Sequence, residues 1–259
     1  MDIHPAMHMP GRKTMAETEL KDGERIDDLQ RNGRVIIQNP SRFCFGIDAV
    51  LLSGFAKVKK GERLIDLGSG NGILPILLEA KNNGTSYTGL EIQPENVEMS
   101  NRSVQLNGTD NVSFIEGDIC RASEIFGKNS CEVVTSNPPY MKAFAGEMNP
   151  ADAVAVARHE IRMTLEDLIR ETTSLLTGNG RCYYVHRPQR LADIICLMRK
   201  YRLEPKKMRL VYPYADREPV LVLIEGRKNG NPELRIDRPL ILYEAPGIYT
   251  QEMRENYGF

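Results

Sequence analysis

The feature that most constrains the fold is a glycine-rich loop between an apolar strand and an apolar helix. Residues 64–73 read LIDLGSGNGI. We expect a strand at Arg63–Leu67, a tight turn at three glycines spaced two apart, and a helix at Ile73–Lys81. Glycine permits such a turn and lets the backbone approach a ligand closely. Pro75 falls in the first helical turn, where its missing N–H is tolerated. The loop therefore predicts a strand–turn–helix unit that can cradle a ligand.

Strands and helices alternate along the rest of the chain. Further strands are expected at Ser86–Leu90, Val112–Glu116, Cys131–Thr135, Arg181–Val185, Arg209–Tyr212 and Val220–Glu225. Further helices are expected at Pro94–Asn107, Thr164–Leu176 and Gln189–Tyr201. This alternation implies an α/β fold, in which helices cover both faces of a parallel sheet and ligands bind at the carboxyl ends of the strands.

The regions on either side of this pattern are interpreted as extensions. Residues 1–25 are polar and poorly patterned, so we expect them to be disordered. Residues 26–60 are expected to form a hairpin and a helix, and residues 61–226 the main domain. Residues 227–259 are interpreted as a tail, since an Asn-Gly-Asn-Pro sequence near their start is typical of a turn or linker.

The helix of the N-terminal extension is expected at Ala49–Phe55, after the short apolar strand Val35–Ile37. Asp48 directly precedes this helix and is predicted to be its N-cap, because aspartate can accept a hydrogen bond from a free N–H of the first turn.

Composition excludes several classes of protein. The 259 residues are 41% hydrophobic, which is ordinary for a globular protein. No apolar stretch approaches the ~18 residues of a membrane span, and no signal peptide is recognised. The five cysteines are scattered without a C-x-x-C pair. They indicate reduced thiols in a cytoplasmic protein and neither a disulfide framework nor a metal site.

The loop departs from the dinucleotide-binding fingerprint. G-x-G-x-x-G would require glycine at position 73, where this chain has Ile73. Asp66 instead places a carboxylate near the turn, which suits a positively charged ligand such as the ammonium and sulfonium of S-adenosylmethionine. Glu91 ends the next strand, where it can accept from two ribose hydroxyls. Asp118 follows the strand after that.

A second motif, Asn-Pro-Pro-Tyr, follows the strand at Cys131–Thr135. The two prolines make residues 138–139 stiff and almost without N–H donors, while their carbonyls can still accept. The Asn137 amide oxygen is another acceptor, and the ring of Tyr140 offers a stacking face. Such a corner fits a planar group that carries an NH2, of which adenine and carboxamides are the biological examples.

With these motifs at successive strand ends, the sequence resembles the class I S-adenosylmethionine-dependent methyltransferases. The resemblance implies a Rossmann-like, seven-stranded, mostly parallel sheet whose last strand, Val220–Glu225, is antiparallel. It implies that the glycines pack against the methionine part, Glu91 holds the ribose and Asp118 accepts from the adenine amino group between Ile92 and Ile119. The candidate cofactor-binding residues are Asp66, Gly68, Ser69, Gly70, Asn71, Gly72, Glu91, Ile92, Asp118 and Ile119.

The candidate catalytic residues are Asn137, Pro138 and Tyr140. The lone pair of an adenine N6 is delocalised into the ring, so this nitrogen is a poor nucleophile. If Asn137 Oδ1 and the Pro138 carbonyl each hold one N–H, the nitrogen can pyramidalise and direct its lone pair at the methyl group. Tyr140 would stack on the flipped base. The motif contains no dedicated general base, and the chemistry does not demand one.

The full pattern narrows the resemblance. The segments 43-FCFGIDAVLL-52, 137-NPPYMK-142, 157-ARHE-160 and 186-HRP-188 are similar to the bacterial tRNA(Val) (adenine-37-N6)-methyltransferase family, over about residues 30–258. The resemblance implies that the acceptor is an adenine beside the anticodon of a valine tRNA, and places Phe45 and Asp48 near the cofactor pocket.

Charge bears on the tRNA partner. The net charge is −1, whereas nucleic-acid binding is driven largely by cations that meet phosphates. Residues 181–209, however, contain nine Lys or Arg against two acidic residues, with Tyr183, Tyr184 and Tyr201 interleaved. This basic segment is a candidate RNA contact, although a solvated helix face would look similar.

Other acceptors stay open at this point. The same corner fits the carboxamide of a protein glutamine, as in a translation release factor, or an adenine of DNA or ribosomal RNA. A binding protein that holds S-adenosylmethionine without transferring the methyl group is the alternative from a different class. Arg158 and His159 can shape an acceptor pocket, whereas a lone histidine such as His186 is more often structural than catalytic.

Overall fold

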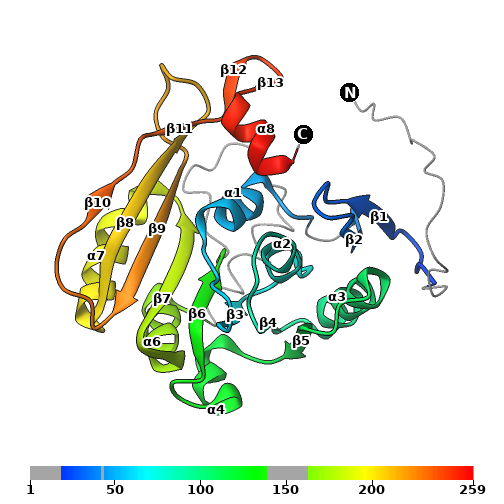
Figure 1. The fold of residues 1–259 in the computed structure, drawn as a ribbon, viewed down its shortest axis with the longest axis horizontal. Helices are drawn as coiled ribbons and strands as arrows, with labels where there is room; N and C mark the ends of the chain where they lie inside the picture. The colour runs from blue at the N-terminus through cyan, green and yellow to red at the C-terminus, as the bar shows by residue number, and fades with distance from the viewer. Residues whose placement is uncertain (1–18, 42–43, 139–162, 259) are drawn as a thin grey trace.

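The computed structural model of the chain describes residues 19–41, 44–138 and 163–258 (Figure 1). The strands of its main sheet are β3 (Arg63–Leu67), β4 (Ser86–Glu91), β5 (Val112–Glu116), β6 (Cys131–Ser136), β7 (Leu176–His186), β8 (Leu203–Tyr212), β9 (Leu221–Lys228), β10 (Arg235–Ile236) and β11 (Leu240–Ile241). The helices are α1 (Ile47–Phe55), α2 (Ile73–Lys81), α3 (Pro94–Asn107), α4 (Ala122–Phe126), α6 (Leu165–Leu175), α7 (Leu191–Lys200) and α8 (Gln251–Tyr257). The seven predicted strands are all present.

Within the described residues the sheet has nine strands in the order β10-β8-β9-β7-β6-β3-β4-β5, with β11 also paired to β8. Strands β7, β6, β3, β4 and β5 run parallel, and β9 is antiparallel to both β7 and β8. The predicted antiparallel last strand is therefore confirmed. The two short strands β10 and β11, which the sequence pattern did not indicate, extend the expected seven-stranded sheet at one edge.

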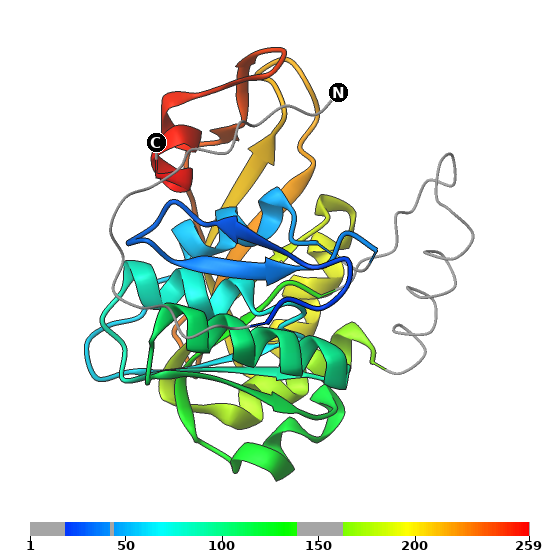
Figure 2. The same ribbon diagram turned by 90° about the vertical axis from the view of Figure 1, so that its right-hand side faces the viewer.

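Helices cover both faces of the sheet, as predicted. One buried apolar cluster joins α1 and α2 to strand residues such as Leu64, Val133 and Leu223. The other cluster joins α6 and α7 to the next residue of each of these strands, Ile65, Val134 and Ile224. Consecutive residues of one strand thus face opposite layers, as expected for a parallel sheet buried on both sides. Figures 1 and 2 show the two layers.

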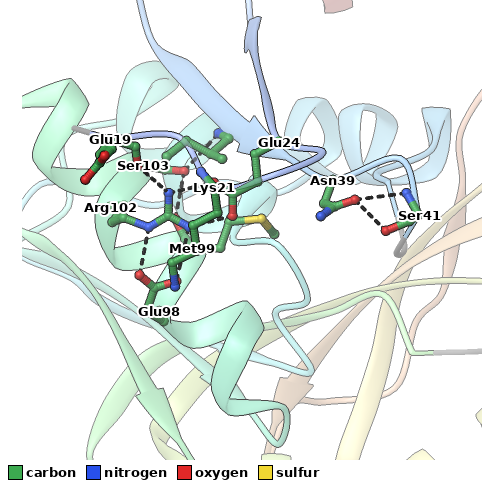
Figure 3. Close-up of polar contacts among 10 residues, drawn as sticks. Glu19, Lys21, Glu24, Asn39, Ser41, Glu98, Met99, Arg102 and Ser103 are labelled. Atoms are coloured by element: carbon green, nitrogen blue, oxygen red, sulfur yellow. Dashed lines mark hydrogen bonds and ion pairs between the residues drawn. The ribbon is translucent and has the colours of Figure 1, made fainter. Parts of the chain in front are cut away.

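The N-terminal extension is a two-stranded hairpin of β1 (Arg25–Asp28) and β2 (Val35–Gln38) that packs on α3. Arg102 of α3 clasps the start of the hairpin through Glu24, at 2.6 Å, and also pairs with Glu98 (Figure 3). The side chains of Arg102 and Glu24 are 13% and 6% exposed, so this pair is shielded from water.

Two sequence interpretations need correction. Gly46, not Asp48, is the N-cap of α1, and the Asp48 carboxylate accepts from the N–H of Ala49 within the first turn. Residues 227–259 are no simple tail, because β10 and β11 join the sheet and α8 packs on α1 (Figure 1). The expectation of disorder for residues 1–25 falls mostly on residues outside the described part of the chain.

The C-terminal segment is tied back to the N-terminal half by cations. After β11 the chain forms a small hairpin of β12 (Tyr243–Ala245) and β13 (Ile248–Tyr249), then α8. Arg31, in the turn of the first hairpin, donates to the carbonyl of Glu255, and Lys81 of α2 donates to that of Asn256. Positive groups at the last carbonyls of a helix are favourable, because the C-terminal end of the helix dipole is negative.

The strand order divides the carboxyl edge of the sheet into two halves. The glycine loop follows β3, Glu91 ends β4 and Asp118 follows β5. Asn137 follows β6, on the side of the sheet that continues to β7, β9 and β8. Both predicted half-sites therefore meet at the boundary between β3 and β6. No helix in the described part of the chain is long and apolar enough to span a membrane.

Candidate active site at the carboxyl edge of the sheet

The glycine loop has the backbone conformation that only glycine adopts without strain. Gly68, Gly70 and Gly72 have φ of 76°, 56° and 86°, in the left-handed region. Gly72 is the N-cap of α2, and a Cβ there would lie 2.6 Å from Phe114 Cζ. At Gly68 a Cβ would lie 3.4 Å from Ile119 Cδ1. The loop is thus shaped by glycine, and it lies beside the residue that follows Asp118.

Asp66 is buried beneath the loop and joins it to β6. Its side chain is inaccessible to water, Ser69 Oγ donates to Oδ2 at 2.7 Å, and Thr135 Oγ1 donates to Oδ1 at 2.6 Å. Burial raises the pKa of Asp66 to about 6, although the hydroxyl hydrogen bonds from Thr135 and Ser69 oppose this rise. Asp66 therefore braces the loop from inside, with both oxygens engaged by the protein.

The carboxylate of Glu91 supports the outer side of the same loop. Gly70 N–H donates to Oε2 at 2.8 Å, and Gln93 N–H donates to Oε1 at 2.9 Å. Glu91 thus joins the end of β4 to the glycine loop. Asp118 follows β5, and its Oδ1 accepts from the N–H of Cys120 at 2.8 Å. Ile92 and Ile119 are both partly exposed at these strand ends.

Asn137 lies next to the glycine loop because β6 pairs with β3. The register Asp66↔Thr135 puts Asn137 two residues beyond a paired position, level with the start of the loop at Gly68. Ser136 Oγ donates to the carbonyl of Leu67 at 2.7 Å, which ties the end of β6 to that of β3. Asn137 is partly exposed and Pro138 is buried. The structure thus brings the first half of the Asn-Pro-Pro-Tyr motif to the loop.

Other predicted site residues fall outside the described part of the chain. These are Phe43, Pro139, Tyr140, Arg158 and His159. His186 is described and is buried, with Nδ1 accepting from the N–H of Arg187 at 2.8 Å. Burial lowers the pKa of His186 to about 4, with the neighbouring Arg190 a further cause. This neutral, buried ring agrees with the structural interpretation of His186.

The basic segment 181–209 is not one continuous cationic surface. Tyr183 and Tyr184 are 1% and 2% exposed, so they are not available to stack on RNA, contrary to the sequence interpretation. They are buried because β7 lies inside the sheet and both of its faces are covered. Six of the nine cations are paired with carboxylates: Arg181, Arg190, Arg199, Lys200, Lys207 and Arg209.

Two polar side chains that contact the site residues were not predicted from the sequence. Thr135 is one of them. The feature of the sequence that could have indicated it is a hydroxyl residue at the polar end of an apolar strand. Gln38 is the other, a buried amide at the end of β2. Its Oε1 accepts from Asn71 Nδ2 and from the N–H of Phe45, both at 3.1 Å. Gln38 therefore connects the N-terminal hairpin, the start of α1 and the glycine loop.

The fold and the site together define a Rossmann-like α/β protein whose glycine loop and polar residues gather at the carboxyl ends of β3, β4, β5 and β6. The sequence matches the methyltransferase domain family over residues 58–209, and the chain belongs to that family. It is an enzyme that transfers methyl groups, and its cofactor is S-adenosylmethionine.

The similarity to individual proteins is at 22–28% sequence identity. The chain is 28% identical over 219 residues to the tRNA1(Val) (adenine(37)-N6)-methyltransferase of Porphyromonas gingivalis, covering 80% of this chain and 84% of the relative. It is 25% identical over 225 residues to the protein of the same name from a Flavobacteriaceae bacterium, covering 83% and 90%. Among solved structures, a predicted O-methyltransferase from Agrobacterium tumefaciens aligns with a TM-score of 0.65 at 22% identity, covering 81% and 95%. This structural likeness concerns the fold.

Proposed function

We propose that the protein methylates the N6 amino group of an adenine in RNA, in a valine tRNA beside the anticodon. The observation that carries the proposal is the register between β3 and β6, which sets Asn137 level with Gly68. A donor site at the loop and an NH2-binding corner on the adjacent strand are what such a transfer needs. The names of the two relatives, each matched over about four fifths of this chain, support tRNA as the acceptor.

The residues of the loop fit the cofactor. The left-handed glycines leave the loop backbone open to close approach, and Asn71 Oδ1 is buried without a hydrogen-bond partner. Glu91 would accept from the ribose hydroxyls and Asp118 from the adenine amino group, with Ile92 and Ile119 beside the ring. When bound, S-adenosylmethionine supplies an electrophilic methyl group on a sulfonium sulfur.

Asn137 and Pro138 would bind the amino group of the acceptor adenine. Asn137 Oδ1 and the carbonyl of Pro138 each accept one N–H of the adenine amino group, which orients the nitrogen and favours its pyramidal form. Alignment of two reactants in this way supplies up to roughly 7–11 kcal/mol. The ring of Tyr140 would stack on the base, a contact worth about 1–3 kcal/mol. Proton loss from the nitrogen follows and requires no dedicated base.

The test is methyl transfer from labelled cofactor to unmodified total tRNA, followed by nucleoside mass spectrometry. We expect N6-methyladenosine in one tRNA species. Asn137→Ala should reduce turnover at least a hundredfold while calorimetry shows unchanged binding of S-adenosylhomocysteine. Asn111→Ala is a matched control, because Asn111 precedes β5 at the opposite edge of the sheet. Label found only on added protein would overturn the proposal in favour of a glutamine acceptor.

A further inference from the structure

The amide of Asn71 is fixed in one orientation by a chain of hydrogen bonds from the N-terminal hairpin. Asp27 can only accept, and Gln38 Nε2 donates to its Oδ2. Gln38 Oε1 therefore faces the other way, where it accepts from the N–H of Phe45, which can only donate. Because Oε1 is the atom offered to the loop, Asn71 must present its Nδ2 to Gln38, at 3.1 Å.

This orientation leaves Asn71 Oδ1 pointing away from Gln38 Oε1. Asn71 is 1% exposed, and its Oδ1 has no hydrogen-bond partner. A buried acceptor without a donor is unfavourable by about 1–3 kcal/mol. Native structures rarely leave such a group unpaired unless it serves a function or meets a ligand or water. The position of Asn71, between Gly70 and Gly72, makes the cofactor the obvious candidate.

The chemistry of the cofactor limits which of its groups can meet this acceptor. S-adenosylmethionine carries three kinds of hydrogen-bond donor, which are the adenine amino group, the ribose hydroxyls and the α-ammonium. The proposed function assigns the first to Asp118 and the second to Glu91. The carboxylate and the sulfonium donate nothing. The ammonium is left, and a charged donor makes the stronger type of hydrogen bond.

We propose that Gln38 sets the Asn71 amide so that Asn71 Oδ1 accepts a hydrogen bond from the ammonium group of the cofactor. Asn71 is then a residue that reads the amino-acid end of the ligand, and Gln38 is a positioning residue outside the main domain. The inference rests on the proposed cofactor contacts of Glu91 and Asp118. It gives the N-terminal hairpin a part in cofactor selection.

The test compares two ligands that differ at the amino-acid end. S-adenosylhomocysteine carries the ammonium, whereas 5′-methylthioadenosine has the same nucleoside and sulfur without the amino-acid group. In calorimetry, Asn71→Ala should lower the affinity for S-adenosylhomocysteine at least tenfold, the size expected for the loss of one charged hydrogen bond. The affinity for 5′-methylthioadenosine should change less than about threefold. Gln38→Leu should act in the same direction by a smaller factor, since it releases the amide without removing it.

Asn101→Ala is the matched control. Asn101 of α3 is a partly buried amide, and its nitrogen and its oxygen both bond to the backbone of Phe114. Asn101→Ala should leave the ratio of the affinities for S-adenosylhomocysteine and 5′-methylthioadenosine unchanged. Equal loss for both ligands in Asn71→Ala, or no loss for either, would overturn the proposal. If Asn71→Ala does not fold, the same comparison of the two ligand affinities in Gln38→Leu tests the proposal. Wild-type protein that binds neither ligand would instead contradict the cofactor contacts themselves.

Discussion

The replacement Asp66→Asn should change how stability depends on pH. Asp66 is inaccessible to water, and burial raises its pKa from 3.8 to about 6. The folded protein therefore holds a proton on Asp66 that the unfolded chain releases at lower pH. A carboxyl group with a raised pKa stabilises the fold below its unfolded pKa, and that stabilisation is lost as the pH rises through its folded pKa.

The magnitude follows from the size of the shift. A rise from 3.8 to about 6 corresponds to about 3 kcal/mol in total. About half of this change, roughly 1.5 kcal/mol, falls between about pH 5 and pH 7.5. Asparagine has nearly the same shape and does not titrate. The free energy of unfolding of the wild type, relative to Asp66→Asn, should therefore fall by roughly 1.5 kcal/mol over that window.

The assay is urea unfolding of both proteins, followed by circular dichroism at several values of pH in this window. A difference that stays constant from about pH 5 to 7.5 would refute the burial argument. Thr135→Val provides a second check. Its hydroxyl lowers the pKa of Asp66, so its removal should move the pH window upward without abolishing it.

Three further changes test the packing. Gly72→Ala should destabilise the fold by more than about 1–2 kcal/mol in thermal melts, because φ is 86° and the new Cβ would lie 2.6 Å from Phe114 Cζ. Gly54→Ala should displace α8 by overlap with Asn256 Oδ1 and lower the melting temperature, and adding Asn256→Gly should restore much of the loss. Burial lowers the pKa of Lys81 to about 8, so its charged form is less favoured in the fold than in the unfolded chain, and the stability of the fold rises as the pH rises through that value. The stability of the wild type relative to Lys81→Met, measured by urea unfolding, should rise between about pH 7 and pH 9.5; a flat difference would contradict the burial of Lys81.

The central sheet was predictable because its strands are short apolar runs bounded by turn residues. The predicted bounds of Arg63–Leu67, Val112–Glu116, Ile73–Lys81 and Pro94–Asn107 are those observed. The site's outline was predictable for a related reason, since parallel strands end at one edge and polar residues at those ends must lie together. The strands β10 and β11 escaped prediction because two residues show no periodicity.

What the sequence could not reveal is pairing over long separations. Gln38 meets Asn71 across 33 positions, and Thr135 meets Asp66 across 69. Arg181 counts as a surface cation by composition, but Glu62 holds its guanidinium in a nearly buried ion pair. A linear pattern records residue types, whereas these bonds exist only after the sheet and the hairpin have packed. Charge clusters in the sequence therefore overstated the basic surface.

The brace through Asp66 has a consequence for redesign. The glycine loop and β6 share one buried carboxylate, so a library that varies Ser69 or Thr135 would disturb both elements at once. New acceptor specificities are better sought further along the sheet, on the segment that joins β8 to β9. Several side chains there are exposed, and replacing them leaves the hydrogen bonds of Asp66 intact.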